Sequence, residues 1–98
     1  MSRAATVRMY TKAWCGYCAA AKNLLKSKRA EFEIIDVGSD RDQLEQMIEL
    51  SGGRTVPQIF INDQPVGGYD DLAALEADGA LDKLLDQAPP VSQITTTE

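Results

Sequence analysis

The sequence predicts one α/β domain, in which a small four-stranded mixed sheet is flanked by helices on both faces. Two observations lead to this fold class. Segments of alternating hydrophobicity and segments with a three- and four-residue repeat follow one another in the order strand, helix, strand, helix, strand, strand, helix, helix. The chain has 98 residues, 44% of them hydrophobic, which is enough for one hydrophobic core and too few for two.

The first predicted strand and helix enclose both cysteines of the chain. Bulky and polar residues alternate over Thr6–Tyr10, which is typical of a strand. Over Ala19–Lys28, apolar residues recur at the spacing of a helix. Cys15 and Cys18 therefore straddle a turn from strand to helix.

A second strand is predicted over Glu31–Val37, and a second helix follows it. Ser39 or Asp40 is a suitable N-cap for this helix, and the "SGG" of residues 51–53 closes it. The apolar residues of the helix share one face and are Leu44, Met47 and Ile48.

The last part of the domain is predicted as a hairpin and an interrupted helix. Pro57–Asp63 and Gln64–Gly68 form the hairpin, which turns at residues 62–64. Helical sequence starts at Asp70 or Asp71, is interrupted by Gly79 and continues to residue 85. Residues 1–87 are thus predicted to form the domain, and residues 88–98, with paired prolines and no apolar repeat, a disordered tail.

The composition excludes several classes of function. The chain has 10 Lys and Arg against 15 Asp and Glu, a net charge of −5, which argues against a nucleic acid or an anionic membrane as the main partner. It contains neither a membrane-spanning apolar run nor the apolar region of a secretory signal. We therefore expect a cytoplasmic protein. In a reducing compartment, Cys-X-X-Cys is more often catalytic or metal-binding than a permanent crosslink.

The cysteine pair has three interpretations. A structural zinc ion needs four ligands, and the chain has 2 cysteines and no histidine, so two chains would have to pool their thiols. A structural disulfide that closes so short a loop stabilises little. A reactive pair is favoured, because residues three apart at the start of a helix lie about 5–6 Å apart and can bridge with modest adjustment. We expect no bound metal ion.

The two sulfurs are expected to have different roles. Cys15 comes first, at the helix N-terminus, where free N–H groups and the helix dipole favour a thiolate, so it is the predicted nucleophile. Cys18 lies inside the first turn and is the predicted resolving thiol. A helix terminus stabilises an anion by only about 0.3–1 kcal/mol, at best about 2, so a further charge is needed. Lys12 is the nearest candidate; the alternative is a solvated lysine at the strand end.

Three blocks of sequence, "YTKAWCGYCAAAKNLL", "GGRTVPQIFIND" and "VGGYDDLAAL", resemble the glutaredoxin family, specifically its small bacterial dithiol members. The resemblance spans residues 6–86. It implies a thioredoxin-like fold, glutathione as cosubstrate, and reduction of protein disulfides and of glutathione mixed disulfides. The implied partners are glutathione and proteins that are glutathionylated or carry a disulfide.

The resemblance also implies the glutathione site. In the second block it implies a cis bond before Pro57, with Thr55 and Val56 pairing with the glutathione main chain; read alone, Pro57 begins an edge strand. In the third block, Gly68 precedes a helix whose first N–H groups receive the γ-glutamyl carboxylate. Trp14 is expected to be a hydrophobic shield beside Cys15. The residues predicted to bind glutathione are Lys12, Tyr17, Thr55, Val56, Pro57, Gly68, Tyr69, Asp70 and Asp71.

Two positions depart from the family pattern. Gly16 stands where the commonest motif has proline, and some relatives with a small residue there hold a 2Fe-2S cluster. The alternative function is therefore a cluster carrier or sensor, in which Cys15 of two chains and two glutathiones bridge a homodimer; otherwise we expect a monomer. Leu44 stands where relatives often direct a basic or amide residue toward the glycine carboxylate of glutathione, and Arg41 and Gln43 are both open as substitutes.

Overall fold

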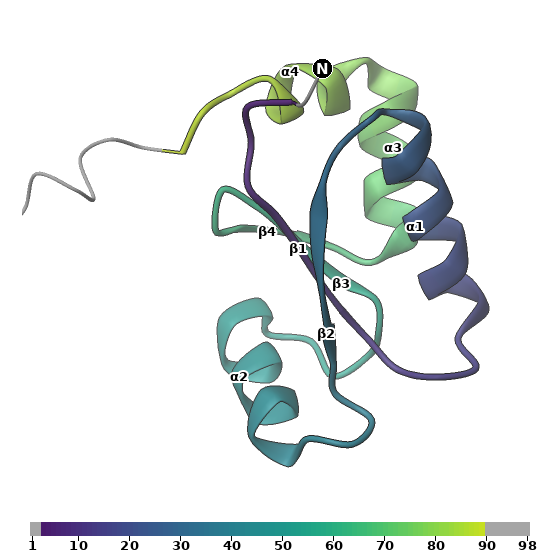
Figure 1. Cartoon of the computed structure of the whole chain (residues 1–98), viewed down its shortest axis with the longest axis vertical. Helices are drawn as coiled ribbons and strands as arrows, with labels where there is room; N and C mark the ends of the chain where they lie inside the picture. The colour runs from purple at the N-terminus through teal and green to yellow at the C-terminus, as the bar shows by residue number, and fades with distance from the viewer. Residues whose placement is uncertain (1–2, 90–98) are drawn as a thin grey trace, which may run out of the picture.

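The computed structural model describes residues 3–89 and has the predicted order of elements (Figure 1). The strands are β1 (Val7–Thr11), β2 (Phe32–Asp36), β3 (Gln58–Ile61) and β4 (Gln64–Gly67). The helices are α1 (Gly16–Ser27), α2 (Arg41–Ser51), α3 (Tyr69–Asp78) and α4 (Ala80–Leu85). Within residues 3–89, no helix has both the length and the apolar character needed to span a bilayer.

The four strands form one mixed sheet in the order β2-β1-β3-β4. β1 runs parallel to β2 and antiparallel to β3, so Met9 lies between Ile34 and Ile59. β3 and β4 are the predicted hairpin and pair antiparallel. The carboxyl end of β1 therefore delivers the chain to the turn that carries both cysteines.

Helices cover both faces of the sheet, as predicted. On one face, Met9 and Ile59 pack with Leu25 of α1 and Leu72 of α3 in the larger core cluster. On the other face, α2 contributes Met47 to a smaller cluster built around Tyr10 and Phe60, whose rings meet edge to face at 5.7 Å. Figure 1 shows α1 and α3 together on one side of the sheet and α2 on the other.

Three helix boundaries refine the sequence prediction. Asp40, rather than Ser39, is the N-cap of α2, and its carboxylate accepts the Gln43 N–H at 3.2 Å. α1 begins at Gly16, ahead of the apolar repeat, because Cys15 itself acts as the N-cap. α3 begins at Tyr69, ahead of both predicted starts, Asp70 and Asp71, because Gly68 occupies the N-cap position.

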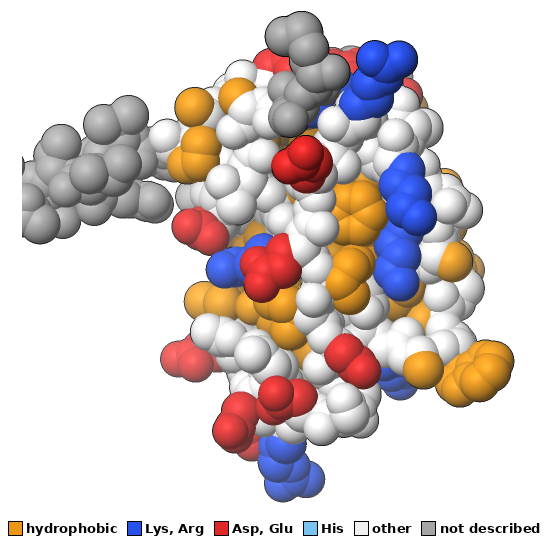
Figure 2. Space-filling view, in the orientation of Figure 1, with side chains coloured by type: hydrophobic (Ala, Val, Ile, Leu, Met, Phe, Trp, Pro, Cys, Tyr) orange, Lys and Arg blue, Asp and Glu red, His pale blue; other side chains and the backbone are white. Residues whose placement is uncertain are grey.

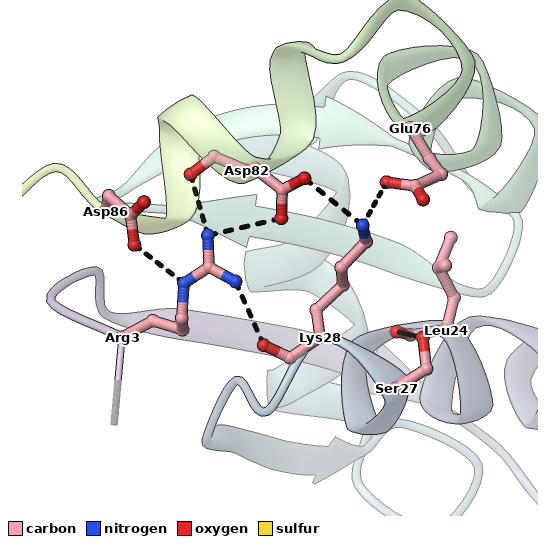
Figure 3. Close-up of polar contacts among 7 residues, drawn as sticks. All are labelled: Arg3, Leu24, Ser27, Lys28, Glu76, Asp82 and Asp86. Carbon is pink, nitrogen blue, oxygen red and sulfur yellow. Dashed lines mark hydrogen bonds and ion pairs between the residues drawn. The ribbon is translucent and has the colours of Figure 1, made fainter. Parts of the chain in front are cut away.

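An ion-pair network ties the end of the domain that lies opposite the cysteine turn (Figure 3). Arg3 pairs with Asp86 at 2.7 Å and with Asp82 at 3.2 Å. Lys28, just after α1, pairs with Glu76 at 2.8 Å and with Asp82 at 3.2 Å. The hydrogen bond from Lys28, ahead of that from Arg3, holds the pKa of the Asp82 carboxyl below its ordinary value. The network joins the start of the chain and α1 to α3 and α4.

The predicted division after residue 87 remains a prediction. α4 ends at Leu85, and residues 88 and 89 belong to no helix or strand. The rest of the proposed tail, residues 90–98, lies outside the described residues.

Candidate active site

Cys15 lies at the point where the turn after β1 enters α1. Its backbone is extended, with φ −111° and ψ 108°, and its Sγ accepts a hydrogen bond from the Cys18 N–H at 3.1 Å. The sulfur therefore occupies the position that a serine or aspartate oxygen takes in an ordinary N-cap. Because an N–H donor at a helix N-terminus stabilises a negative acceptor, this geometry suits a thiolate.

Cys18 is one turn into the helix and is buried, with 2% of its surface exposed. Burial, and after it the hydrogen bond with Cys15, raises the pKa of the Cys18 thiol from 9.0 to about 11. Both cysteines are free thiols. The pair is thus asymmetric, because one sulfur is accessible and accepts an N–H, whereas the other is enclosed and held in its neutral form.

The segment before β3 faces Cys15. The Val56–Pro57 peptide bond is cis, as the family resemblance implies. The Cys15 thiol donates to the Val56 carbonyl oxygen at 3.8 Å. Within residues 3–89, the Val56 N–H makes no hydrogen bond, so it remains available to an extended ligand.

A hollow of about 480 Å³ lies between this segment and α3, and we call it the α3 hollow. It brings together all but one of the residues predicted to bind glutathione; the exception, Lys12, lies beside Cys15. The predicted residues that line the hollow are Tyr17, Thr55, Val56, Pro57, Gly68, Tyr69, Asp70 and Asp71. The rings of Tyr17 and Tyr69 stack at 6.3 Å, so two aromatic side chains form one side of it.

The N-terminus of α3 opens into this hollow. Asp71 accepts the Gly68 N–H at 3.0 Å through Oδ2, which holds the first turn of the helix against the end of β4. Gly67 has φ +115°, which strains any residue with a side chain, and a Cβ there would displace the Asp71 carboxylate from its bond with the Gly68 N–H. Asp70 is exposed and makes no such bond within the described residues.

A second hollow of about 670 Å³, the α2 hollow, adjoins Cys15 on the side of α2. Lys12, Trp14, Leu44 and Arg54 line it, and Tyr17, Thr55 and Val56 line both hollows. The two hollows therefore adjoin at the Thr55–Val56 segment, and we call them together the groove; Cys15 lines its α2 side.

Arg54 was missed by the sequence prediction. Arg41 and Gln43, the two candidates for the basic end of the site, do not line the α2 hollow. The Gln43 Oε1 is buried and has no hydrogen bond from any residue between 3 and 89. The signal was present in the sequence, because Arg54 directly precedes the "TVP" block.

The sequence prediction also missed Gln58, whose buried side chain supports the groove. Its Nε2 donates to the Thr55 carbonyl oxygen at 3.0 Å. A Cβ on Gly53 would lie 2.7 Å from the same nitrogen, so a glycine there leaves room for the amide. Gln58 thus fixes the position of the segment that lines both hollows.

The expectation for Trp14 was wrong. Its side chain is fully exposed, at 102% of the reference area, and it joins neither core cluster. Its φ of +62° lies in the left-handed region, which is uncommon for a bulky residue. Trp14 therefore does not cover Cys15 as a shield.

Comparisons with known proteins agree with this geometry. The family model described as Glutaredoxin matches residues 7–66. Glutaredoxin 3 of Escherichia coli (strain K12) is 51% identical over 81 residues, which cover 83% of this chain and 98% of that protein. A buckwheat glutaredoxin–glutathione complex has a TM-score of 0.75 at 29% identity, covering 81% of this chain and 74% of that chain. The holo form of glutaredoxin C1 from Populus tremula × tremuloides has a TM-score of 0.75 at 32% identity, covering 84% and 77%.

Proposed function

The chain belongs to the glutaredoxin family and is a thiol–disulfide oxidoreductase with a thioredoxin-like fold; from this premise we propose that glutathione is its cosubstrate. The proposed reactions are the reduction of glutathione mixed disulfides and of protein disulfides. We place them in the cytoplasm, where a reducing glutathione pool is available.

The groove beside Cys15 is the observation that carries the proposal. Glutathione is an extended tripeptide with a carboxylate at each end and its thiol near the middle. The groove offers the helix N-terminus of α3 at one end, Lys12 and Arg54 at the other, and the Val56 N–H between them. A glutathione laid along it has its sulfur beside Cys15, its γ-glutamyl carboxylate at Tyr69 and its glycine carboxylate near Arg54.

The first chemical step is an exchange at Cys15. Its thiolate attacks the glutathione sulfur of a mixed disulfide, forming a Cys15–glutathione disulfide and releasing the substrate as a thiolate. The Cys18 N–H, which already donates to Cys15 Sγ, stabilises the attacking charge.

The second step has two routes. The thiolate of a second glutathione attacks the glutathione sulfur of the adduct, which releases the Cys15 thiolate and yields oxidised glutathione. Alternatively, the Cys18 thiolate attacks Cys15 Sγ and forms an internal disulfide, which two glutathiones reduce. The high pKa of Cys18 slows this second route at neutral pH, because little of the thiol is ionised.

Single-cysteine variants test the two roles. We expect Cys15→Ser to abolish all activity, and Cys18→Ser to retain reduction of a glutathione mixed disulfide in a glutathione-coupled assay. Reduction of a protein disulfide should fall in both variants, because it uses the internal route. A comparable loss of mixed-disulfide activity in both variants would contradict the assignment.

A matched pair of aspartate variants tests glutathione recognition. Asp70→Ala should raise the KM for the mixed disulfide, because Asp70 lies at the carboxylate-binding end of the groove and can hold the glutathione ammonium group. Asp78→Ala, at the other end of α3, is the control and should leave KM unchanged. Equal KM values for the two variants would contradict the proposal that glutathione binds in the α3 hollow.

A second candidate function is the cluster-bridged homodimer. The described residues contain no cluster of three or more His, Cys, Asp or Glu side chains suited to a metal ion, so one chain cannot hold a 2Fe-2S cluster alone. Cys15 is partly exposed, and the space around the Gly16 Cα is open, so the cysteine turn leaves room for a second chain. Anaerobic reconstitution with iron, sulfide and glutathione should then give a coloured dimer that survives Cys18→Ser and is lost in Cys15→Ser. A colourless monomer would exclude the cluster-bridged homodimer and leave the oxidoreductase as the only proposed function.

A further inference from the structure

A third hollow reaches the cysteine pair and shares no lining residue with the α3 hollow. It has a volume of about 540 Å³, lies along the first turns of α1 and is called here the α1 hollow. Cys15 and Cys18 both line it, together with Trp14, Lys12 and Lys22. The α1 hollow shares Lys12, Trp14, Cys15 and Gly16 with the α2 hollow, whereas Cys18 and Lys22 line the α1 hollow and neither part of the groove.

Trp14 stands at the rim of this hollow without support from the rest of the domain. Its side chain is wholly exposed, although a tryptophan in water loses the hydrophobic gain of burial. Its left-handed backbone is unfavourable for a bulky residue. Figure 2 shows a hydrophobic projection at the lower right, where Figure 1 places the turn between β1 and α1. An exposed tryptophan is an unusual surface feature and a typical anchor of a protein interface.

The charge around the α1 hollow is opposite to that of the whole chain. Lys12 and Lys22 line it and no Asp or Glu does, although the chain carries a net charge of −5. In Figure 2, acidic side chains gather instead at the lower end of the molecule, over α2. The hollow is therefore a local basic site on an acidic protein, and it favours an acidic occupant.

We propose that Trp14 and the α1 hollow dock a segment of a protein substrate that carries acidic residues beside its reacting disulfide. Trp14 contacts the apolar part of that segment, and Lys22 pairs with its carboxylates. This proposal rests on the thiol–disulfide exchange function described above. It assigns Trp14, Cys18 and Lys22 to the docking of protein substrates and leaves the α3 hollow to glutathione.

The placement of Cys18 gives the docking site a chemical role. The Cys15 thiolate attacks one sulfur of the partner disulfide, forming a mixed disulfide and releasing the other partner cysteine as a thiolate. The Cys18 thiolate, after losing its proton to solvent, then attacks Cys15 Sγ, which releases the first partner cysteine and leaves the Cys15–Cys18 disulfide. The partner gains two electrons and the enzyme loses two. A partner held in the α1 hollow stays beside the sulfur that resolves it.

Peptide substrates provide the test. Two synthetic peptides carry the same internal disulfide, which is flanked by glutamates in one and by lysines in the other. The rate at which the dithiol form of the enzyme reduces each peptide is measured at low ionic strength. We expect the acidic peptide to have a kcat/KM about tenfold higher, and this preference to shrink in high salt and in Lys22→Glu. Trp14→Ala should lower kcat/KM for the acidic peptide about tenfold, and Trp14→Phe should restore most of it.

The controls separate this inference from the proposed function. Lys83→Glu makes the same charge change on α4, at the other end of the domain, and should leave the peptide preference unchanged. Reduction of a small glutathione mixed disulfide should be unaffected by Lys22→Glu, because Lys22 lines neither part of the glutathione groove. If the wild type lacks that activity, the proposed glutathione function is wrong; if it has that activity and shows no peptide preference, the docking inference alone is wrong.

The fluorescence of Trp14 gives a readout that does not depend on turnover, because it is the only tryptophan of the chain. In Cys18→Ser, the mixed disulfide between Cys15 and a peptide with one cysteine can be trapped. We expect the acidic peptide adduct to shift the emission to shorter wavelength and to protect Trp14 from acrylamide quenching. The glutathione adduct serves as the comparison and should give less protection. Equal protection by both adducts would overturn the assignment of Trp14 to a protein-docking surface.

Discussion

The buried thiol of Cys18 makes a quantitative prediction about chemical modification. A rise in its pKa from 9.0 to about 11 lowers the ionised fraction at neutral pH about a hundredfold, to about one thiol in ten thousand at pH 7. Because alkylating reagents react with the thiolate, the rate of modification should fall in proportion. Burial is the largest cause of the shift, so the effect should persist when Cys15 is replaced.

The variant Cys15→Ser isolates this thiol, since the chain has 2 cysteines. We expect its rate of alkylation by iodoacetamide, followed by mass spectrometry, to rise about tenfold per pH unit between pH 7 and 10 without levelling off. The same variant unfolded in urea is the control and should level off near the ordinary thiol pKa. A folded protein whose rate levels off at or below pH 9 would refute the reasoning that burial holds Cys18 neutral.

The sign of the shift also sets the pH dependence of the reaction. The folded state favours the neutral thiol, so the stabilisation from this group is complete below pH 9 and is lost as the pH rises through about 11. Over the same range the Cys18 thiolate becomes abundant. Closure of the internal disulfide should therefore accelerate with rising pH, whereas at lower pH the Cys15 adduct should last longer and be resolved by glutathione.

Three further changes have defined expected outcomes. Gly67→Ala should destabilise the protein by about 1–3 kcal/mol in urea unfolding, because φ +115° strains a residue with a side chain and a methyl group would displace the Asp71 carboxylate; unchanged stability would contradict this. Gln58→Leu removes the donor to the Thr55 carbonyl and should raise the KM for a glutathione mixed disulfide about tenfold with little change in kcat. A fall in kcat alone would argue against a positioning role. Trp14→Gly should raise stability by up to about 1 kcal/mol, since it relieves a left-handed backbone and loses no packing; a measurable loss would show that Trp14 is supported by the fold.

The order of elements and the two-faced packing could be predicted because they depend on local patterns. The helical spacing in α1 and α2 buries one face of each helix against the sheet, whereas β1 is an inner strand whose Met9 and Tyr10 lie in the two opposite core clusters. The predicted start of α3 was too late in the sequence, because it also depended on a local signal. The strongest capping signals, Asp70 and Asp71, drew the prediction into the helix, whereas the N-cap is Gly68, which has no side-chain signal.

The parts of the site that escaped prediction depend on tertiary placement. The position of Arg54 directly before the "TVP" block was the available signal, but its place in the α2 hollow depends on the tertiary position of the loop after α2. The sequence pattern places Gln58 in a strand, but it does not show that its side chain donates to the backbone carbonyl of Thr55, three residues earlier. Trp14 was misjudged because hydrophobicity predicts burial, whereas its side chain lies in solvent.

The cap of α1 couples redox state to folding. In an ordinary helix the N-cap acceptor is chemically inert, but here it is the sulfur of Cys15, which accepts the Cys18 N–H. This bond stabilises the folded dithiol. Any part of that free energy that the disulfide form does not keep raises the reduction potential of the folded protein above that of the unfolded chain. The conversion is about 30 mV of reduction potential for each 1.4 kcal/mol. Residues that adjust the first turn of α1 therefore set the midpoint of the couple without touching either substrate.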